Sequence, residues 1–208
     1  MSQEILIWDR AASSLAPARF HEDVTADQLA EAESQWKPFR QAAAQRLLSS
    51  GSTPQDVFRL IQHLHWDWLR KAQPLREGLL SVRCFGIEAE DRWQGLVMVE
   101  LAAHSAELEP DKGKPLAYVE FLESAPWNLA EMSDAPRFGL IGKRLMEAVI
   151  RQSIEEGFGG RVGLLALPQA EPFYQDCHMA HPDGLAKLGM NWYELTGKNA
   201  GEFLGERQ

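Results

Sequence analysis

The most regular hydrophobic pattern of the chain lies between residues 136 and 157. Apolar side chains recur there at helical spacing, on one stripe formed by Ile141, Leu145, Met146, Val149, Ile150 and Ile154. Gly157 follows the stripe and is typical of a helix end. The pattern therefore predicts an amphipathic helix that begins near Gly142.

A strand, a loop and a long helix are predicted in the first quarter of the chain. The strand covers residues 4–8, and the small, proline-containing stretch at residues 11–21 is typical of a loop. Thr25, followed by a glutamine three residues later, has the form of a capping box and opens a helical region that runs to about residue 49. Pro38 lacks the N–H that a helix interior needs, so it should kink or split this helix.

A second helix begins at Thr53 and Pro54, which combine an N-cap with a first-turn proline. Its core stripe is formed by Val57, Leu60, Ile61, Leu64 and Trp68. Trp66 lies on the opposite face of such a helix. It therefore either packs under the N-terminal segment or lines a binding cleft.

The remaining apolar runs are short and predict β-strands over residues 79–87, 94–103, 117–126, 161–167 and 185–195. The first two form an antiparallel hairpin around the polar turn at residues 88–92, and residues 107–115 form a loop. Thr196 can cap a short C-terminal helix. The chain contains no repeat or linker, so its 208 residues fit one α/β domain.

The charge balance narrows the class of partner. A formal net charge of −9 argues against binding to nucleic acid or to an anionic membrane, because an acidic surface would have to approach phosphates. A cationic ligand remains compatible with this charge. The apolar run at residues 5–8 is too short for a signal peptide or a membrane span, so we expect a cytoplasmic protein.

A metal centre is not expected. Cys84 and Cys177 are the only cysteines, and two cysteines this far apart provide neither a disulfide framework nor metal-ligand spacing. His63, His65 and Asp67 alternate along a predicted helix, where residues two apart point away from each other.

The loop before the helix at residue 142 has the chemistry of an anion site. It carries Arg137, Gly139 and Gly142, and Lys143 and Arg144 follow in the first helical turn. Cations there oppose the helix dipole, at a cost of about 0.3–1 kcal/mol each, unless an anion binds at the helix end. Free N–H groups, glycines and basic side chains together form a phosphate cradle. The alternative is a surface helix with incidental basic residues.

The order of strand, anion loop, helix, strand and Phe-Tyr helix resembles the GNAT superfamily of acyl-CoA-dependent N-acyltransferases. The phosphate loop of that family reads Arg/Gln-x-x-Gly-x-Gly/Ala, and residues 137–142 read Arg-Phe-Gly-Leu-Ile-Gly. Arg137 and Gly142 match the pattern, whereas Leu140 replaces its middle glycine. The motifs cover residues 117–179.

The later Ala-x-x-Phe-Tyr element of the family matches at Ala170, Phe173 and Tyr174. Leu167 replaces the asparagine that often stands at its start. The strand pattern extends the resemblance over about residues 80–195.

The resemblance implies a central mixed, mostly antiparallel, twisted sheet flanked by helices. It implies that acetyl-CoA is the cosubstrate, without a metal, and that an acetyl group moves by direct attack of a primary amine. The acceptor is a small molecule or a peptide, and a homodimer is left open. In this fold the first two helices line the site that binds the acceptor. The helical region at residues 25–72, with Trp66, is therefore expected to contact the acceptor.

The resemblance also assigns residues to the CoA compound. They lie at the end of the strand that enters the loop, in the loop itself and at the helix start: Leu122, Ser124, Arg137, Phe138, Gly139, Leu140, Ile141, Gly142 and Lys143.

The reaction needs a base, because an amine of pKa near 10.4 is neutral only to about one part in 10³ at pH 7. Glu120 and Glu123 lie on the same strand and on opposite faces if it is regular. Glu120 is favoured as the base, directly or through water, and Glu123 is assigned to substrate binding. The alternative for either residue is a solvated strand position.

Tyr174 matches the family tyrosine that often protonates the departing thiolate, and the alternative is a core tyrosine. Asn128 either binds substrate or caps a turn. The insertion at residues 127–135 contains Glu131 and Asp134, which would favour a cationic acceptor if it borders the site. The rival to an enzyme is a non-catalytic GNAT-like module that binds CoA or a protein partner.

Overall fold

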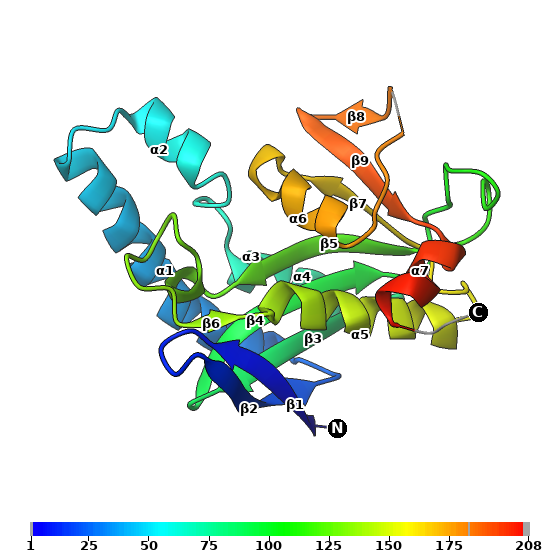
Figure 1. Cartoon of the computed structure of the whole chain (residues 1–208), viewed down its shortest axis with the longest axis horizontal. Coiled ribbons are helices and arrows are strands. Elements are labelled where there is room, and N and C mark those ends of the chain that lie inside the picture. The colour runs from blue at the N-terminus through cyan, green and yellow to red at the C-terminus, as the bar shows by residue number, and fades with distance from the viewer. Residues whose placement is uncertain (1, 183, 206–208) are drawn as a thin grey trace. The chain divides into compact units, whose positions relative to one another are not determined.

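The structure is a computed structural model that describes residues 2–182 and 184–205 (Figure 1). The strands are β1 (Ser2–Asp9), β2 (Ser14–His21), β3 (Val82–Ala89), β4 (Arg92–Glu100), β5 (Ala117–Ser124), β6 (Phe138–Gly139), β7 (Val162–Ala166), β8 (Ala186–Lys187) and β9 (Met190–Leu195). The helices are α1 (Ala26–Ser49), α2 (Pro54–Leu60), α3 (Trp68–Lys71), α4 (Gln73–Arg76), α5 (Ile141–Glu155), α6 (Glu171–Asp176) and α7 (Gly197–Phe203). Two 3₁₀ turns are η1 (Pro126–Asn128) and η2 (Pro168–Ala170).

The strands form one sheet in the order β6-β1-β2-β3-β4-β5-β7-β9-β8. The pairs β1–β2, β1–β6, β2–β3, β7–β9 and β8–β9 are antiparallel, and β5–β7 is parallel. Helices flank this mixed, mostly antiparallel sheet. The predicted fold class is therefore confirmed.

The chain divides into two compact units, which are described separately. The first unit contains residues 2–80, 84–96 and 123–142, and the second contains residues 81–83, 97–122, 143–182 and 184–205. Both units are built from segments that are far apart in the sequence.

In the first unit, α1 packs against α2, α3, α4 and η1. Figure 1 shows α1 as the long helix of this unit, with α2 beside it. A small apolar cluster closes the contact between α1 and α2, where Ala43, Ile61 and Met132 are buried. Met132 and the half-buried Leu129 belong to the predicted insertion, so this segment provides core side chains to the helical region.

In the second unit, the buried stripe of α5 consists of Leu145, Met146, Val149 and Ile150, as the periodicity predicts. Ile154, at the end of the predicted stripe, is 45% exposed. The parallel β5–β7 pair aligns Ala117 with Val162 and Val119 with Leu164, and all four are buried. Apolar residues that alternate along both strands therefore face the core.

Several local predictions are confirmed. Thr25 and Thr53 each form a capping box, with Gln28 and Asp56 respectively, and the Thr196 side chain accepts from the N–H of residue 199 at the start of α7. α5 begins at Ile141, next to the predicted start. The β3–β4 hairpin is present, and its turn consists of Glu90 and Asp91, both at positive φ.

The loop predicted over residues 11–21 is wrong, because most of it forms β2. Ala18 and Phe20 are buried and alternate with exposed neighbours, as in a half-buried strand. Pro17 lacks an N–H, but it lies where β2 pairs with β1 alone, since β3 pairs only with residues 19–21. A proline is tolerated at such an edge position.

The length predicted for the second helix is also wrong. The prediction extended it to Trp68, whereas α2 ends at Leu60 and a new helix starts at Trp68. The new start is set by carboxylates: the Glu33 carboxylate accepts from the N–H of Trp68 at 2.9 Å, and the Asp67 side chain accepts from the N–H of Arg70 at 3.2 Å. Trp66 therefore does not lie on a continuous helix.

Pro38 does not split α1, which is unbroken from residue 26 to residue 49. A proline in a helix interior costs about 3 kcal/mol. The helix persists through it because Trp36 and Arg40, on either side of Pro38, are almost completely buried. None of the described helices is long and apolar enough to cross a membrane.

Candidate functional site

The anion loop runs from Arg137 into the start of α5, and its backbone is held on both sides. β6 pairs with β1 through Gly139 and Trp8, and the N–H of Phe138 donates to the Oδ1 of Asn128 at 2.9 Å. The N–H of Arg137 donates to the carbonyl of Trp127 at 3.2 Å. Phe138 is buried, so the loop is anchored by an apolar side chain as well as by hydrogen bonds.

Leu140 has a φ of 65° and is 40% exposed. This left-handed conformation costs a leucine about 1–2 kcal/mol, and glycine adopts it freely. Leu140 is the residue that stands in place of the glycine in the phosphate-loop pattern. The backbone at position 140 thus has the conformation that glycine favours, although the residue there is a leucine. Ile141, the next residue, is buried and starts α5.

The guanidinium of Arg137 is paired within the protein. It forms ion pairs with Asp9, at the end of β1, and with Glu90, at 2.7 Å, in the β3–β4 turn. The N–H of Ala12 and the charge of Arg137 hold the pKa of Asp9 below its usual value, against the effect of burial. Arg137 therefore fixes the loop to two strand ends.

Asn128, in η1, contacts the loop directly. Its Oδ1 accepts from Phe138, and its Nδ2 donates to the Oε1 of Gln94 at 3.0 Å. Gln94 also accepts from the indole of Trp127 at 2.9 Å, and all of these side chains are buried. The Asn128 side chain therefore joins η1 to β4 and to the anion loop, and these bonds to distant residues do not cap its own turn.

We expect Asn128→Ala to destabilise the protein by about 2 kcal/mol, because the buried N–H of Phe138 loses its side-chain acceptor and the Oε1 of Gln94 loses one of its two donors. Urea unfolding would measure the change. Ser133→Ala, in the same insertion but outside this network, should change stability by less than about 0.5 kcal/mol. A folded Asn128→Ala protein of unchanged stability, but with a raised KM for the acceptor, would instead indicate substrate binding.

The β5 residues predicted for the site alternate in burial. Glu120 is exposed, and Leu122 and Ser124 are half-buried on the same side of the strand, whereas Glu123 is buried on the opposite side. Tyr118 also lies on the Glu120 side and stacks on His104, with ring centroids 3.9 Å apart. Burial and the charge of Glu120 raise the pKa of Tyr118. An exposed carboxylate on this side of β5 is available to a ligand.

Tyr174 lies on α6 and is buried beside Phe173 and Tyr193, whose ring centroids are 5.1 and 6.1 Å from its own. Burial, together with the nearby thiol of Cys177, raises the pKa of Tyr174, so its hydroxyl remains protonated at neutral pH. Burial likewise raises the pKa of Cys177 to about 12, against the charge of the exposed Lys143. A neutral phenol can donate a proton, whereas a thiol with this pKa is a poor nucleophile.

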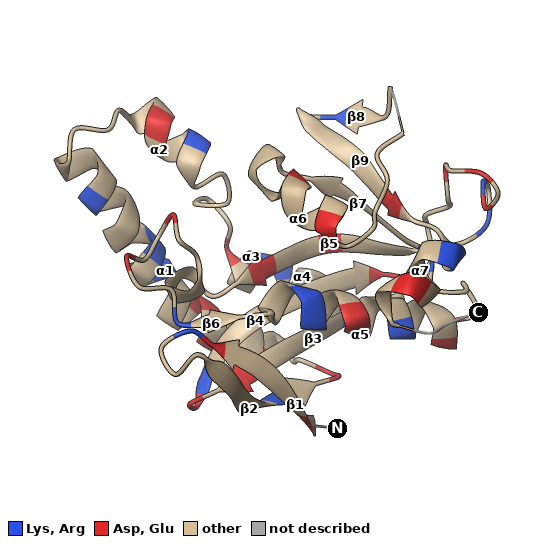
Figure 2. Cartoon of the chain, in the orientation of Figure 1, with Lys and Arg blue, Asp and Glu red and all other residues tan. Residues whose placement is uncertain are grey.

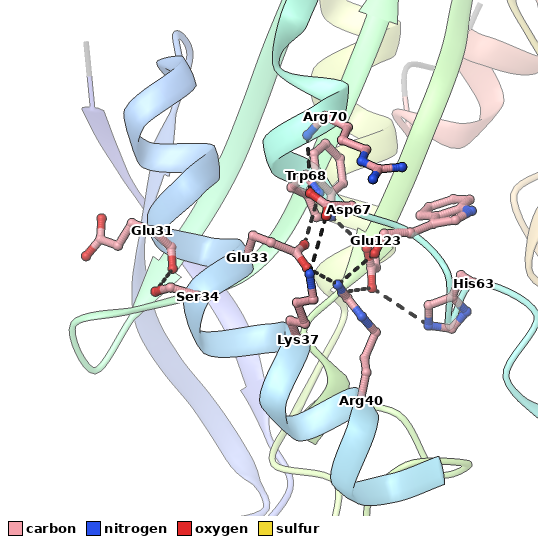
Figure 3. A network of polar contacts seen from close by, with 11 residues as sticks. Glu31, Glu33, Ser34, Lys37, Arg40, His63, Asp67, Trp68, Arg70 and Glu123 are labelled. Atoms are coloured by element: carbon pink, nitrogen blue, oxygen red, sulfur yellow. Dashed lines mark hydrogen bonds and ion pairs between the residues drawn. The ribbon is translucent and has the colours of Figure 1, made fainter.

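A buried polar network occupies the helical region of the first unit (Figure 3). The guanidinium of Arg40, on α1, donates to the carboxylates of Glu33 at 2.7 Å and Glu123 at 2.9 Å. It also donates to the carbonyl of Trp66 at 3.0 Å, and the indole of Trp68 donates to the second oxygen of Glu123 at 2.6 Å. Arg40 thereby connects Trp66 and Glu123, two residues that the sequence pattern assigned to the acceptor.

Burial is the main cause of the pKa shifts of Glu123 and His63 in this network. Arg40 is 1% exposed and Glu123 is 3% exposed. Burial raises the pKa of Glu123, and the charge of Arg40 works against that rise. His63 lies 3.8 Å from Glu123, and burial, followed by the charges of Arg40 and Lys71, lowers the pKa of His63 to about 4. The imidazole is therefore neutral at pH 7.

Glu33, Arg40 and Lys71 were not predicted as site residues. Glu33 and Arg40 belong to the buried stripe of α1, together with Leu29, Ala32, Trp36 and Ala43. Charged residues at core positions of an amphipathic helix are the signal that could have identified them, because such residues are rarely buried unless they are paired.

The predicted site residues are divided between the two units. Trp66, Glu123, Ser124, Asn128 and the loop to Gly142 belong to the first unit. Glu120, Leu122, Lys143 and Tyr174 belong to the second. Figure 2 shows acidic and basic residues spread over many elements, and α5 carries both kinds. Among the described residues, no group of three or more His, Cys, Asp and Glu side chains could hold a metal ion.

No protein-family model matches the sequence, and a search of curated proteins found no match. Solved structures do match. The GNAT domain of PAT from S. lividans is 12% identical, with coverage of 93% of this chain and 96% of that one and a TM-score of 0.52. A GCN5-related N-acetyltransferase from Ralstonia eutropha JMP134 is 15% identical, with coverage of 82% and 97% and a TM-score of 0.50.

A structure described as a bacterial toxin is 9% identical, with coverage of 100% of this chain and 97% of that one and a TM-score of 0.58. At such identities the likeness shows the fold alone. The chain has the fold of the GNAT superfamily.

Proposed function

We propose that this chain, which has the GNAT fold, is an acetyl-CoA-dependent N-acetyltransferase that acts on a primary amine of a small molecule or peptide. The observation that carries the proposal is the turn at Leu140, whose φ of 65° leads directly into the N-terminus of α5. Unpaired N–H groups at a helix N-terminus bind phosphate, and the exposed Lys143 adds a cation in the first turn.

Arg137 contributes to this cradle indirectly. Its guanidinium is engaged by Asp9 and Glu90, so in the proposed mechanism it holds the loop in shape while backbone N–H groups contact the pyrophosphate. The affinity for CoA then depends on backbone access at Gly142 more than on the Arg137 charge.

In the proposed reaction, the amine nitrogen forms a bond to the acetyl carbon and the carbon–sulfur bond of acetyl-CoA breaks. Glu120 takes the amine proton, directly or through water, and lowers a barrier of about 4–5 kcal/mol that arises because the acceptor is almost entirely protonated at pH 7. The Tyr174 hydroxyl gives a proton to the departing thiolate sulfur. Glu120 is exposed, and Tyr174 is protonated at neutral pH, which is compatible with these roles.

The alternative is a non-catalytic module that binds CoA or a protein partner. The internal pairing of Arg137 and the leucine at position 140 favour it. Incubation with acetyl-CoA and a panel of primary amines, followed by mass spectrometry, separates the two functions: an enzyme yields an acetylated product, and a CoA-binding module yields none while still binding CoA.

We expect Gly142→Val to abolish detectable binding of CoA, because a branched side chain blocks the approach of a phosphate to the backbone of the first turn. Isothermal titration would measure the affinity. Ala148→Val introduces the same side chain six residues further along α5 and should leave the affinity within about twofold. An unchanged CoA affinity in a folded Gly142→Val protein would contradict the proposed cradle.

A further inference from the structure

The ammonium group of Lys71 lies on the face of an aromatic ring. Its Nζ is 3.2 Å from the ring centroid of Trp66 and 5.3 Å from that of Trp68. The Nζ atom is buried, although the Lys71 and Trp66 residues are each half-exposed. A cation in this position is attracted by the negative face of the indole, and the attraction is strongest where water is excluded.

The buried network supplies a second reason for a cation at this point. When both carboxylates are ionised, Glu33 and Glu123 carry two negative charges, whereas Arg40 carries one positive charge and His63 is neutral at pH 7. In that state the four groups together have a net charge of −1. The charge of Lys71 lowers the pKa of both Glu123 and His63, so its ammonium is within electrostatic reach of the network that it neutralises.

Two features indicate that another cation could replace the Lys71 ammonium on the Trp66 ring. It is the last residue of α3, a helix of only four residues, and it reaches Trp66 through a flexible four-carbon stem. Trp66, in contrast, is fixed, because its carbonyl accepts from Arg40 and its ring makes an edge contact with His63 at 5.8 Å between centroids. Trp66 is therefore held in place by these two contacts, whereas the cation is carried by a long, flexible side chain.

We propose that the indole face of Trp66, a residue bonded to the Glu33–Arg40–Glu123 network, is a binding site for the primary ammonium group of a ligand, and that the Lys71 side chain occupies this site until the ligand displaces it. The identification of that ligand as the acetyl acceptor rests on the proposed function. The ammonium site itself does not depend on it. The chemistry selects an unbranched alkylammonium, because that is the group the site already holds.

The probe is n-propylammonium, which reproduces the atoms from Cγ to Nζ that Lys71→Ala removes. At pH 7 it is almost completely protonated, as its pKa is close to that of lysine. We expect n-propylammonium chloride to raise the Tm of Lys71→Ala and to bind it about tenfold more tightly than 1-propanol, which has the same chain without the charge. The wild-type protein should bind the probe more weakly than the variant, because Lys71 competes.

Three controls test where the probe binds. Lys71→Met keeps an apolar stem in the site, and Lys37→Ala removes an exposed lysine that pairs with Asp67 at 3.5 Å. Neither should gain a propylammonium-specific rise in Tm. In Lys71→Ala/Trp66→Leu the aromatic face is absent, so the preference for n-propylammonium over 1-propanol should disappear.

The inference is overturned if 1-propanol stabilises Lys71→Ala as much as n-propylammonium, or if the double variant retains the preference. If Lys71→Ala does not fold in buffer, recovery of its folded state by n-propylammonium but not by 1-propanol supports the site, and failure of both to restore it counts against the site. Acetyl transfer is assayed separately. Binding of the probe without transfer to any amine refutes the proposed function alone, and transfer without a probe site refutes this inference alone.

Discussion

Tyr174→Phe is expected to lower kcat for acetyl transfer by about 10²- to 10⁴-fold, because the variant loses the hydroxyl that we propose protonates the thiolate. The substitution keeps the ring contacts with Phe173 and Tyr193, so the affinity for CoA should stay within about twofold and the fold should be retained. Steady-state kinetics with an identified acceptor, combined with titration of CoA, would measure both quantities.

Tyr193→Phe is the matched control. The Tyr193 hydroxyl donates to Glu171 at 3.2 Å and accepts from Gln175 at 3.1 Å, so its loss should reduce stability by about 1 kcal/mol and leave kcat nearly unchanged. A Tyr174→Phe rate within about threefold of the wild type would show that Tyr174 packs in the core and is not the acid, since general acids contribute far more than this.

Arg40→Met should destabilise the protein by about 3–5 kcal/mol, because it leaves the carboxylates of Glu33 and Glu123 buried without their main counter-charge. Urea unfolding at pH 8 would measure the loss. Lys37→Met lies one turn earlier on α1 and removes only an exposed ion pair, so we expect a change below about 1 kcal/mol. A loss of similar size in both variants would mean that Arg40 contributes only apolar packing.

The destabilisation by Arg40→Met should depend on pH. Burial already raises the pKa of Glu123, and removal of Arg40 raises it further. The same substitution removes a charge that lowers the pKa of His63. Both changes make the folded variant bind protons more tightly than the folded wild type. Its stability loss should therefore be largest near about pH 8 and smaller near about pH 5, and a loss independent of pH would contradict the electrostatic origin.

Local rules predicted much of the fold. The helix starts at Thr25 and Thr53 follow from capping chemistry that involves residues only three apart, and the start of α5 follows from a strong apolar period. The strands around the anion loop were found within a few residues of their ends. These elements are encoded by neighbours in the sequence, so a single sequence suffices to find them.

The errors arose where distant residues decide the local structure. α3 starts at Trp68 because Glu33, 35 residues earlier, accepts from its backbone N–H. Residues 14–21 form a strand because β1 and β3 lie on either side of them. Neither influence is visible in the local pattern.

The candidate site was predictable only in part, for the same reason. The anion loop is a contiguous motif, so it could be proposed as a site from its glycines and basic residues alone. Arg40 could not be paired with Glu123 from the sequence, because nothing in the two segments specifies that contact. Lys71 was indistinguishable from a surface lysine until the structure placed its ammonium on Trp66.

The pairing of Arg40 with Glu123 also constrains how the protein can be made. The two residues are 83 positions apart, and Glu33, only seven positions from Arg40, is synthesised long before Glu123. At a synthesis rate of roughly 5–20 residues per second, about 4–17 s pass between the synthesis of Arg40 and that of Glu123, its second carboxylate partner. During that interval Arg40 has one of its two acidic partners. The first unit thus completes its core only after the start of the second has been synthesised. A nascent chain that stops before β5 would therefore lack one carboxylate partner of Arg40, a residue that is buried in the complete protein.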